Sequence, residues 1–196
     1  ARQVASLVGA KGVDEALKSF HGAERRLQVL QDGEITVVDD YAHHPREITA
    51  SIQALRERYP GRRLVVIFQP HLYSRTADFL PEFAFTLSAA DWLVMTDIYP
   101  AREAPIAGIS SARIAEAATC LCDYVPSRHV LPRFVASRLL PGDVVVGMGA
   151  GNISEFAPNL IKELARGPAR RVVVCPGGDS AEREVSLHSG RAIASA

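Results

Sequence analysis

The sequence predicts an α/β fold with a mainly parallel sheet and flanking helices. Strand-like apolar segments alternate with helical segments at least four times, which is typical of a domain with a parallel sheet. The run Leu64–Phe68 is uninterrupted by any polar residue, as expected for a strand that is buried on both faces.

The first elements follow from the spacing of apolar residues. Apolar residues within 1–20 fall near helical spacing and predict the end of a helical region. Ile35–Asp40 reads as a short apolar strand, and Pro45 then stands where a first helical turn tolerates proline. The helix that begins there places one apolar face on the domain core, formed by Ile48, Ile52, Leu55 and Tyr59.

The same patterns give the remaining elements. In chain order, we expect a strand at Leu64–Phe68, a helix from about Thr76 to Ala89 with Pro81 in its early part, a strand at Trp92–Asp97, a helix at Ser111–Ala118, a short strand near Tyr124, a strand at Val144–Gly149 and a helix from about Ser154 to Arg166. After a short basic linker, a new strand is expected at Val172–Cys175.

Composition and charge restrict the class of protein. The 22 basic and 22 acidic residues cancel, so nucleic acid and an anionic membrane are not expected partners. No apolar run approaches the roughly 20 residues that span a bilayer. The three cysteines form no metal-type pair and are expected to be reduced thiols. These features predict a cytoplasmic protein.

Polar residues concentrate in four loops that follow predicted strands. Ligands of open parallel sheets bind beyond the carboxyl ends of the strands, so these loops are the expected site. The loops are Asp39–Pro45, Gln69–Thr76, Asp97–Glu103 and Gly147–Asn152.

Each loop also has a purely structural interpretation. Asp39 and Asp40 suit a helix cap or a turn, and His43 and His44 suit a partly exposed surface. Arg75 is either a solvated arginine or a bidentate clamp on a carboxylate or phosphate. The adjacent histidines have no third ligand at a familiar spacing, so no metal site is predicted.

The glycine loop leaves two alternatives open. Gly147, Gly149 and Gly151 either present backbone N–H groups to an anion or form a tight strand-to-helix turn. The chain contains no G-x-x-x-x-G-K-[ST] phosphate loop, so it lacks the element that normally cradles the phosphates of ATP.

Two long motifs carry a resemblance to a known family. DDYAHHPREI and FQPHLYSRTADFLPEFA resemble the third, C-terminal domain of the Mur ligases, and most closely that of the alanine-adding members. SFHGAERRLQV resembles the junction with the central ATPase domain, and LPGDVVVGMGAGNI a late strand and glycine turn. The resemblance divides the chain into the end of the central domain, residues 1–24, and a C-terminal domain, residues 25–166, and it implies that this C-terminal domain is Rossmann-like.

The resemblance implies an ATP-dependent amide-forming ligase of peptidoglycan precursors. In such enzymes ATP, with Mg²⁺, is held mainly by the central domain and phosphorylates the carboxylate of UDP-N-acetylmuramate. The amine of L-alanine then attacks the acyl phosphate. By resemblance, Asp40 and His43 face the nucleotide, Tyr41 faces the alanine pocket, and His71 and Arg75 hold the alanine carboxylate. Arg75 and His43 are the expected catalytic residues.

One position departs from the family pattern. Many relatives carry arginine where this chain has Leu72, which leaves Arg75 with more of the positive charge near the acyl phosphate.

The tail carries a second resemblance. After a linker at residues 167–170, residues 171–196 resemble the first strand, glycine loop and helix of D-alanine–D-alanine ligases, with GGDSAEREVSLHSG as the specific part. Glu182 falls where that family places a carboxylate facing the ammonium group of the first D-alanine. An ordinary strand–turn–helix extension of the first domain is the alternative.

Two other classes of function compete with the ligase. One is a stand-alone nucleotide-binding module, which rests on the α/β pattern and the glycine loop alone. The other is a regulatory or interaction domain without catalysis. The ligase hypothesis predicts that this chain alone is inactive, because the phosphate loop must lie upstream.

Overall fold

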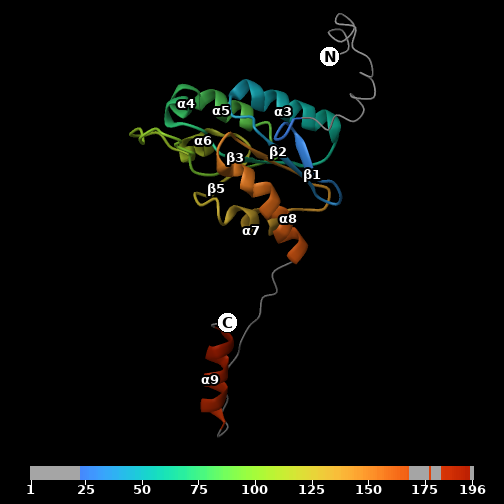
Figure 1. The fold of residues 1–196 in the computed structure, drawn as a ribbon, viewed down its shortest axis with the longest axis vertical. Helices are drawn as coiled ribbons and strands as arrows, with labels where there is room; N and C mark the ends of the chain where they lie inside the picture. Colours follow the sequence, from blue (N-terminus) through green and yellow to red (C-terminus); the bar gives the residue numbers. More distant parts are fainter. Residues whose placement is uncertain (1–22, 168–176, 178–181, 195–196) are drawn as a thin grey trace, which may run out of the picture. The chain divides into compact units, whose positions relative to one another are not determined.

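The computed structural model describes residues 23–167, 177 and 182–194 (Figure 1). The chain divides into two compact units, 1–165 and 166–196. The first unit contains the sheet, and the described part of the second is mainly the helix α9, Arg183–Ala194. The helical region expected within residues 1–20 and the strand expected at Val172–Cys175 lie outside the described residues.

A six-stranded sheet forms the centre of the first unit, in the order β1-β2-β6-β3-β4-β5. β1 pairs with β2 in the antiparallel sense, and all other neighbours are parallel. The predicted α/β fold with a mainly parallel sheet is therefore confirmed. The strands are β1 (Gln28–Gln31), β2 (Thr36–Asp40), β3 (Leu64–Phe68), β4 (Trp92–Met95), β5 (Leu121–Tyr124) and β6 (Val144–Met148).

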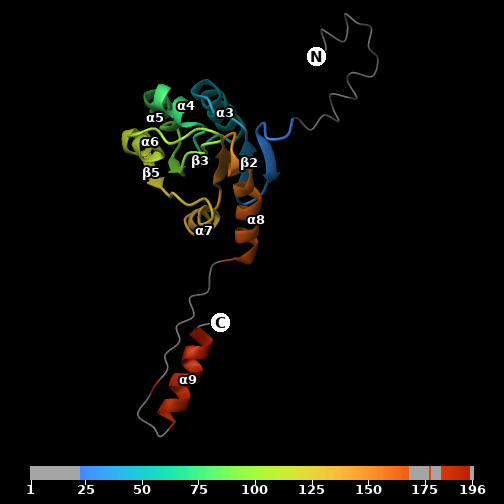
Figure 2. The ribbon, with the colours of Figure 1, turned by 60° about the vertical axis from the view of Figure 1, so that its left-hand side comes forward.

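Helices cover both faces of the sheet (Figure 2). One face packs against α3 (Pro45–Arg58), α5 (Leu80–Leu87) and α6 (Ser111–Ala117), as their buried residues Ile48, Phe83 and Ile114 belong to one core cluster. The opposite face packs against α7 (Leu131–Ala136) and α8 (Phe156–Arg166) through a second cluster. The remaining short helices are α4 (Tyr73–Asp78) and the 3-10 helix η1 (Asn152–Glu155).

The alternation along β2 decides where its two terminal carboxylates lie. Val37 and Val38 belong to the two different core clusters, because successive side chains of a strand point to opposite faces. Asp39 and Asp40 continue this alternation, and both are buried. The adjacent aspartates therefore face different surroundings and cannot share one role.

The expected helix from Thr76 to Ala89 is in fact two helices, α4 and α5. The break lies at Phe79, two residues before Pro81, which has no N–H to donate within a helix. The expected helix from Ser154 begins as the 3-10 turn η1 and becomes α-helical at Phe156. The sequence patterns also missed β1 and α7.

Candidate functional site

The carboxyl ends of the parallel strands lie level with one another. Met148 at the end of β6 pairs with Asp40 of β2 on one side and with Phe68 of β3 on the other, and Phe68 pairs with Met95 of β4. The loops that follow these strands therefore begin side by side at one edge of the sheet. This is the edge at which parallel α/β sheets bind their ligands.

Asp40 is turned into the domain. Its side chain accepts hydrogen bonds from the hydroxyl of Ser51 on α3 and from the backbone N–H of Ala42, the latter at 3.4 Å. The residue is 1% exposed. In this structure Asp40 thus fixes the connection between β2 and α3, and contact with a nucleotide would require it to exchange these partners.

Four rings form a row across the loops after β2, β3 and β4. Tyr41 and His43 lie 5.2 Å apart edge to face, and His43 and His71 lie 6.2 Å apart in the same manner. His71 then stacks on Tyr99, with ring centroids 5.6 Å apart and an interplanar angle of 18°. Tyr41, His43 and His71, which were predicted separately, are therefore neighbours.

The two adjacent histidines have different partners. His44 is the N-cap of α3, where its Nδ1 accepts a hydrogen bond from the N–H of Arg46 at 3.3 Å. His43 instead faces the row of rings, and its Nδ1 donates to the carbonyl of Tyr41 at 2.9 Å. Nδ1 of His43 also lies 3.2 Å from Oε2 of Glu47, so Nε2 is the ring nitrogen through which His43 could meet a ligand.

The loops after β3 and β4 are hydrogen-bonded to each other. The N–H of Leu72 donates to the carbonyl of Tyr99 at 3.0 Å, and the N–H of Tyr99 donates to the carbonyl of Pro70 at 2.8 Å. Leu72 has φ +74°, a left-handed conformation that a leucine rarely adopts. This strain is held in place by the pairing with the second loop, as is common near functional sites.

Glu103 holds the first turn of α4. Its carboxylate accepts hydrogen bonds from the N–H of Ser74 at 2.9 Å and from the hydroxyl of Ser74 at 2.5 Å. These bonds lower the pKa of Glu103. An anion at the amino end of a helix satisfies a backbone donor that has no partner within the helix. Glu103 therefore helps to position the helix that carries Arg75.

Arg75 on α4 and His71, just before that helix, form a pair. Arg75 Nη1 lies 3.4 Å from His71 Nδ1. A guanidinium can only donate, so Nδ1 of His71 must be the acceptor and is unprotonated. Burial, and then the positive charge of Arg75, lower the pKa of His71 below its ordinary value. At neutral pH the pair thus offers one fixed cation beside a neutral imidazole.

Removing the charge of Arg75 is expected to raise the pKa of His71. Arg75→Gln should move the His71 midpoint, measured by NMR titration of the imidazole, back toward the ordinary value of about 6.5. Arg113→Gln, on α6, is the control and should leave it unchanged. Because folding lowers this pKa, His71 contributes stability above about pH 6.5, and that contribution is lost as the pH falls through the folded-state pKa. If the pKa of His71 is the same in Arg75→Gln as in the parent chain, the two side chains do not interact and cannot act together in the site.

The glycine loop is a tight turn in this structure. The N–H of Gly149 donates to the carbonyl of Asp40 at 3.2 Å, and the N–H of Ile153 donates to Oε1 of Gln69 at 3.0 Å. Nε2 of the same Gln69 amide donates to Oδ1 of Asn152 at 2.9 Å. Two backbone donors are thus already used within the protein, which favours the tight turn over an anion cradle.

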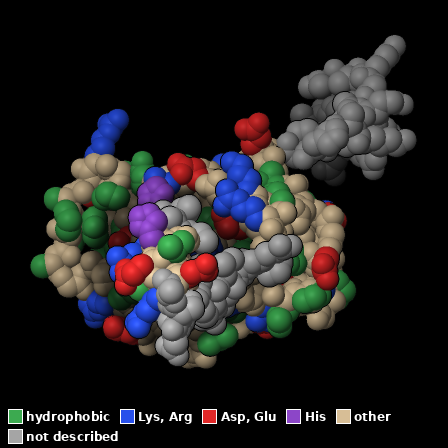
Figure 3. Space-filling model, turned by 90° about the horizontal axis from the view of Figure 1, so that it is seen from below, with side chains coloured by type: hydrophobic (Ala, Val, Ile, Leu, Met, Phe, Trp, Pro, Cys, Tyr) green, Lys and Arg blue, Asp and Glu red, His purple; other side chains and the backbone are tan. Residues whose placement is uncertain are grey.

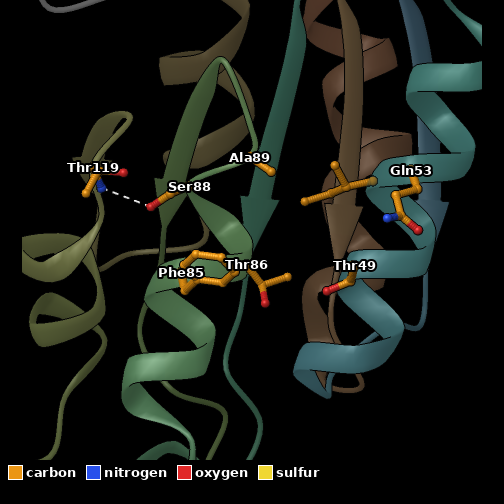
Figure 4. Close-up of a pocket in the computed structure, with 8 residues that line it drawn as sticks. Thr49, Gln53, Phe85, Thr86, Ser88, Ala89 and Thr119 are labelled. Carbon is orange, nitrogen blue, oxygen red and sulfur yellow. Dashed lines mark hydrogen bonds between the residues drawn. The ribbon is translucent and has the colours of Figure 1, made fainter.

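Of two cavities in the described part of the chain, the first lies away from the row of rings, and the second is lined by Tyr99, the last ring of the row. One, of about 390 Å³, is a groove between α3 and α5 with Phe85, Thr86 and Thr49 along it (Figure 4). Another, of about 250 Å³, lies beside Asp97 and Asn152, beyond the ends of β3 and β4. None of the predicted site residues lines either cavity.

Basic and acidic side chains are interspersed over the face seen in Figure 3, without a continuous patch of one sign. Within residues 23–167, 177 and 182–194, no three His, Cys, Asp or Glu side chains are grouped as a metal site would require. No helix among the described residues has the length and apolarity needed to cross a membrane.

The structure thus brings Tyr41, His43, His71 and Arg75 together at the sheet edge. Asp40 is instead buried, with its carboxylate bonded to Ser51 on α3. Glu182 belongs to the second unit, just before α9. Sequence reasoning missed Tyr99 and Glu103 as contributors, although both lie in a loop that was singled out as a whole.

Comparison with known proteins identifies the family of the chain. The family profile described as "Mur ligase, glutamate ligase domain" matches residues 25–151. A UDP-N-acetylmuramate–L-alanine ligase of Salinibacter ruber is 47% identical over 146 residues, covering 72% of this chain and 31% of that protein. The enzyme of the same name from Mycolicibacterium vanbaalenii is 41% identical over 158 residues, covering 79% and 33%. The chain spans about a third of the length of these relatives.

Solved structures show the same fold. The UDP-N-acetylmuramate–alanine ligase of Thermotoga maritima matches with a TM-score of 0.71 and 25% identity, over 85% of this chain and 36% of that one. A murein peptide ligase of Psychrobacter arcticus matches in fold, with a TM-score of 0.64 and 22% identity over 80% and 33% of the two chains. The chain therefore belongs to the Mur ligase family, of which it contains the C-terminal domain.

Proposed function

We propose that this chain supplies the amino-acid-binding domain of an ATP-dependent ligase that joins L-alanine to UDP-N-acetylmuramate, a step of peptidoglycan precursor synthesis. The observation that carries the proposal is the pair of Arg75 with neutral His71 at the ligand-binding edge of the sheet. The names of the most similar relatives support the choice of L-alanine and UDP-N-acetylmuramate.

The proposed reaction brings two anionic partners together. A carboxylate oxygen of UDP-N-acetylmuramate attacks the γ-phosphorus of ATP, and ADP leaves. The amine of L-alanine, after losing a proton, attacks the carbonyl carbon of the resulting acyl phosphate, and phosphate leaves as the amide forms. Both the alanine carboxylate and the acyl phosphate are negatively charged, so a fixed cation between them stabilises the transition state. Arg75 fits this role, because its planar fork matches a carboxylate.

The other site residues divide between the two ligands. We assign Tyr41 and His71 to the L-alanine pocket beside Arg75, and His43 and Asp40 to the nucleotide side. His43 is the second proposed catalytic residue. Asp40 would act chiefly by holding the loop that carries Tyr41 and His43, since its oxygens are bonded to Ser51 and Ala42.

ATP and its Mg²⁺ are proposed to bind mainly outside this chain. The proposal rests on the sequence, which has no phosphate loop to cradle the phosphates that Mg²⁺ would accompany. This domain would complete the site by closing onto the ATP-binding domain. A cytoplasmic location is proposed with it, where ATP and the nucleotide-linked substrate are available.

The chain alone is therefore expected to lack ligase activity and to bind ATP weakly at best. Calorimetry with residues 1–196 tests the ATP affinity, and phosphate release tests activity, with and without the upstream domains. The complete enzyme should release phosphate only when L-alanine and UDP-N-acetylmuramate are both present. Micromolar ATP binding by the isolated chain would instead support a stand-alone nucleotide-binding module.

We also propose that residues 171–196 begin a D-alanine–D-alanine ligase fused to the first enzyme. The motif GGDSAEREVSLHSG supports this, as does the division of the chain into units near residue 166. Glu182 would then face the ammonium group of a D-alanine. The coding sequence beyond Ala196 tests the fusion: a D-alanine–D-alanine ligase domain should follow, and its absence would reduce the tail to an extension of the first domain.

A further inference from the structure

Arg25 joins three parts of the site edge, although the motif SFHGAERRLQV that contains it gave it no role of its own. Its Nε donates to Oδ2 of Asp39 at 2.9 Å, and its Nη2 donates to the carbonyl of Gly149 at 2.7 Å. Its guanidinium also lies over the ring of Tyr41, 5.0 Å from the centroid. One side chain thus contacts the end of β2, the glycine turn and the proposed alanine pocket.

The backbone of Arg25 is fixed as well. Its carbonyl accepts a hydrogen bond from the N–H of Tyr41 at 2.7 Å, and its N–H donates to the side chain of Gln28 at 3.0 Å. Arg25 has φ +55° and Leu27 has φ +46°. Left-handed conformations at two bulky residues so close together are costly, and they persist only when surrounding contacts over-determine them.

Asp39 depends on this arginine. Its side chain is 6% exposed, and burial raises its pKa while Arg25 opposes the rise. Among the described residues Oδ1 of Asp39 has no hydrogen-bond partner, so its ion pair with Arg25 is the main compensation for its burial. Breaking the Arg25–Asp39 ion pair would leave a buried carboxylate without a counter-charge, which costs free energy. The ion pair therefore holds the Arg25 side chain in one conformation.

We propose that Arg25 is a positioning residue that holds Tyr41 and the glycine turn in the geometry used to bind L-alanine. The two donors that it uses, Nε and Nη2, are separate nitrogens of one rigid plane and reach different acceptors, a carboxylate and a carbonyl. A lysine ammonium carries all its donors on one nitrogen, so it cannot reproduce this placement. The strained backbone brings the carbonyl of Arg25 to the N–H of Tyr41, so the side-chain contacts and the position of Tyr41 are coupled.

Hydrogen exchange of this chain tests the coupling without any assumption about activity. Arg25→Met should speed exchange of the Tyr41 amide by roughly 5–30-fold, the effect of losing one or two ordinary interactions, while amides of the central strand β3 stay protected. Arg25→Lys should resemble Arg25→Met. Arg58→Met is the matched control and should leave exchange of the Tyr41 amide unchanged. Arg58 also lies over a tyrosine ring, but over that of Tyr59, at 5.4 Å. Unchanged Tyr41 exchange in Arg25→Met would overturn the proposal.

Kinetics of the complete ligase test the consequence, which rests on the proposed function. Arg25→Met should raise the KM for L-alanine by roughly ten- to a hundredfold, the scale of misplacing a binding group, with a smaller change in kcat and in the KM for ATP. If the Tyr41 amide loses protection but the KM for L-alanine is unchanged, Tyr41 does not serve alanine binding and the positioning role is wrong. If the wild-type protein does not use L-alanine at all, the proposed function fails, and the exchange result on the isolated chain still decides whether Arg25 positions Tyr41.

Discussion

Arg75→Ala is expected to slow L-alanine addition by the complete ligase at least about a hundredfold, the scale of losing one charge-stabilising donor. Arg75 contributes the cation of the pair with His71, and His71 itself is kept neutral at physiological pH. Arg75 is the only arginine of the loop Gln69–Thr76, so no second guanidinium from this loop can take over. The expected loss is therefore in kcat/KM for L-alanine.

The fold should survive this change, because Arg75 is a half-buried side chain of a short helix and belongs to neither core cluster. Arg75→Lys should also be impaired, since an ammonium cannot reproduce the planar fork. Arg113→Ala is the control: Arg113 lies on α6 and its side chain donates to the carbonyl of Gly108 at 3.0 Å. Near-normal turnover in Arg75→Ala would show that another residue carries the charge.

The strands and helices that sequence patterns identified are those whose signals are local and strong. β3 is a continuous apolar run and lies at Leu64–Phe68 as expected. α3 begins at Pro45, and its apolar face is buried at Ile48, Ile52 and Leu55 as the spacing predicts. In both cases burial on the sheet selects the same residues that the periodicity marks.

The elements that escaped prediction have weak signals. β1 reads QVLQ, is only half-buried, and is defined by antiparallel pairing with β2 rather than by its own pattern. α7 has six residues, too few for a helical period to stand out. The break between α4 and α5 falls at Phe79, which no pattern marks, although Pro81 lies just beyond it.

The candidate site likewise divides into features with a local sequence signal and features without one. The loops could be located because each follows a recognisable strand, and the resemblance selected Tyr41, His43, His71 and Arg75 within them. What sequence patterns do not contain is the contact between loops. The stacking of His71 on Tyr99 joins residues 28 positions apart, and the bond from Arg25 to Gly149 joins residues 124 positions apart. Only the sheet order brings these loops together.

Substitution at the glycine turn measures how strongly it holds these loops. Gly149 has φ +147°, and a Cβ placed on it would lie 2.7 Å from the carbonyl oxygen of Gln69 and 3.0 Å from Cγ2 of Ile153. Gly149→Ala therefore combines an unfavourable backbone conformation with overpacking against a backbone atom. Each of these costs roughly 1–3 kcal/mol, so we expect a loss of about 3 kcal/mol in the free energy of unfolding, measured by urea denaturation of this chain.

Substitutions at two other glycines separate the cost of the backbone conformation from the cost of overpacking. Gly61 has φ +74° with no atom within 4 Å of a Cβ, so Gly61→Ala should show the backbone cost alone, about 1 kcal/mol. Gly33 has neither a positive φ nor an atom within 4 Å of an added Cβ. The free energy of unfolding of Gly33→Ala should therefore stay within about 0.5 kcal/mol of that of the parent chain. If Gly149→Ala costs no more than Gly61→Ala, the turn has room to yield and is not clamped against Gln69. A larger loss than in Gly61→Ala would mean that the close contact between the turn and the loop after β3 is built into the fold, because a methyl group cannot enter without moving Gln69.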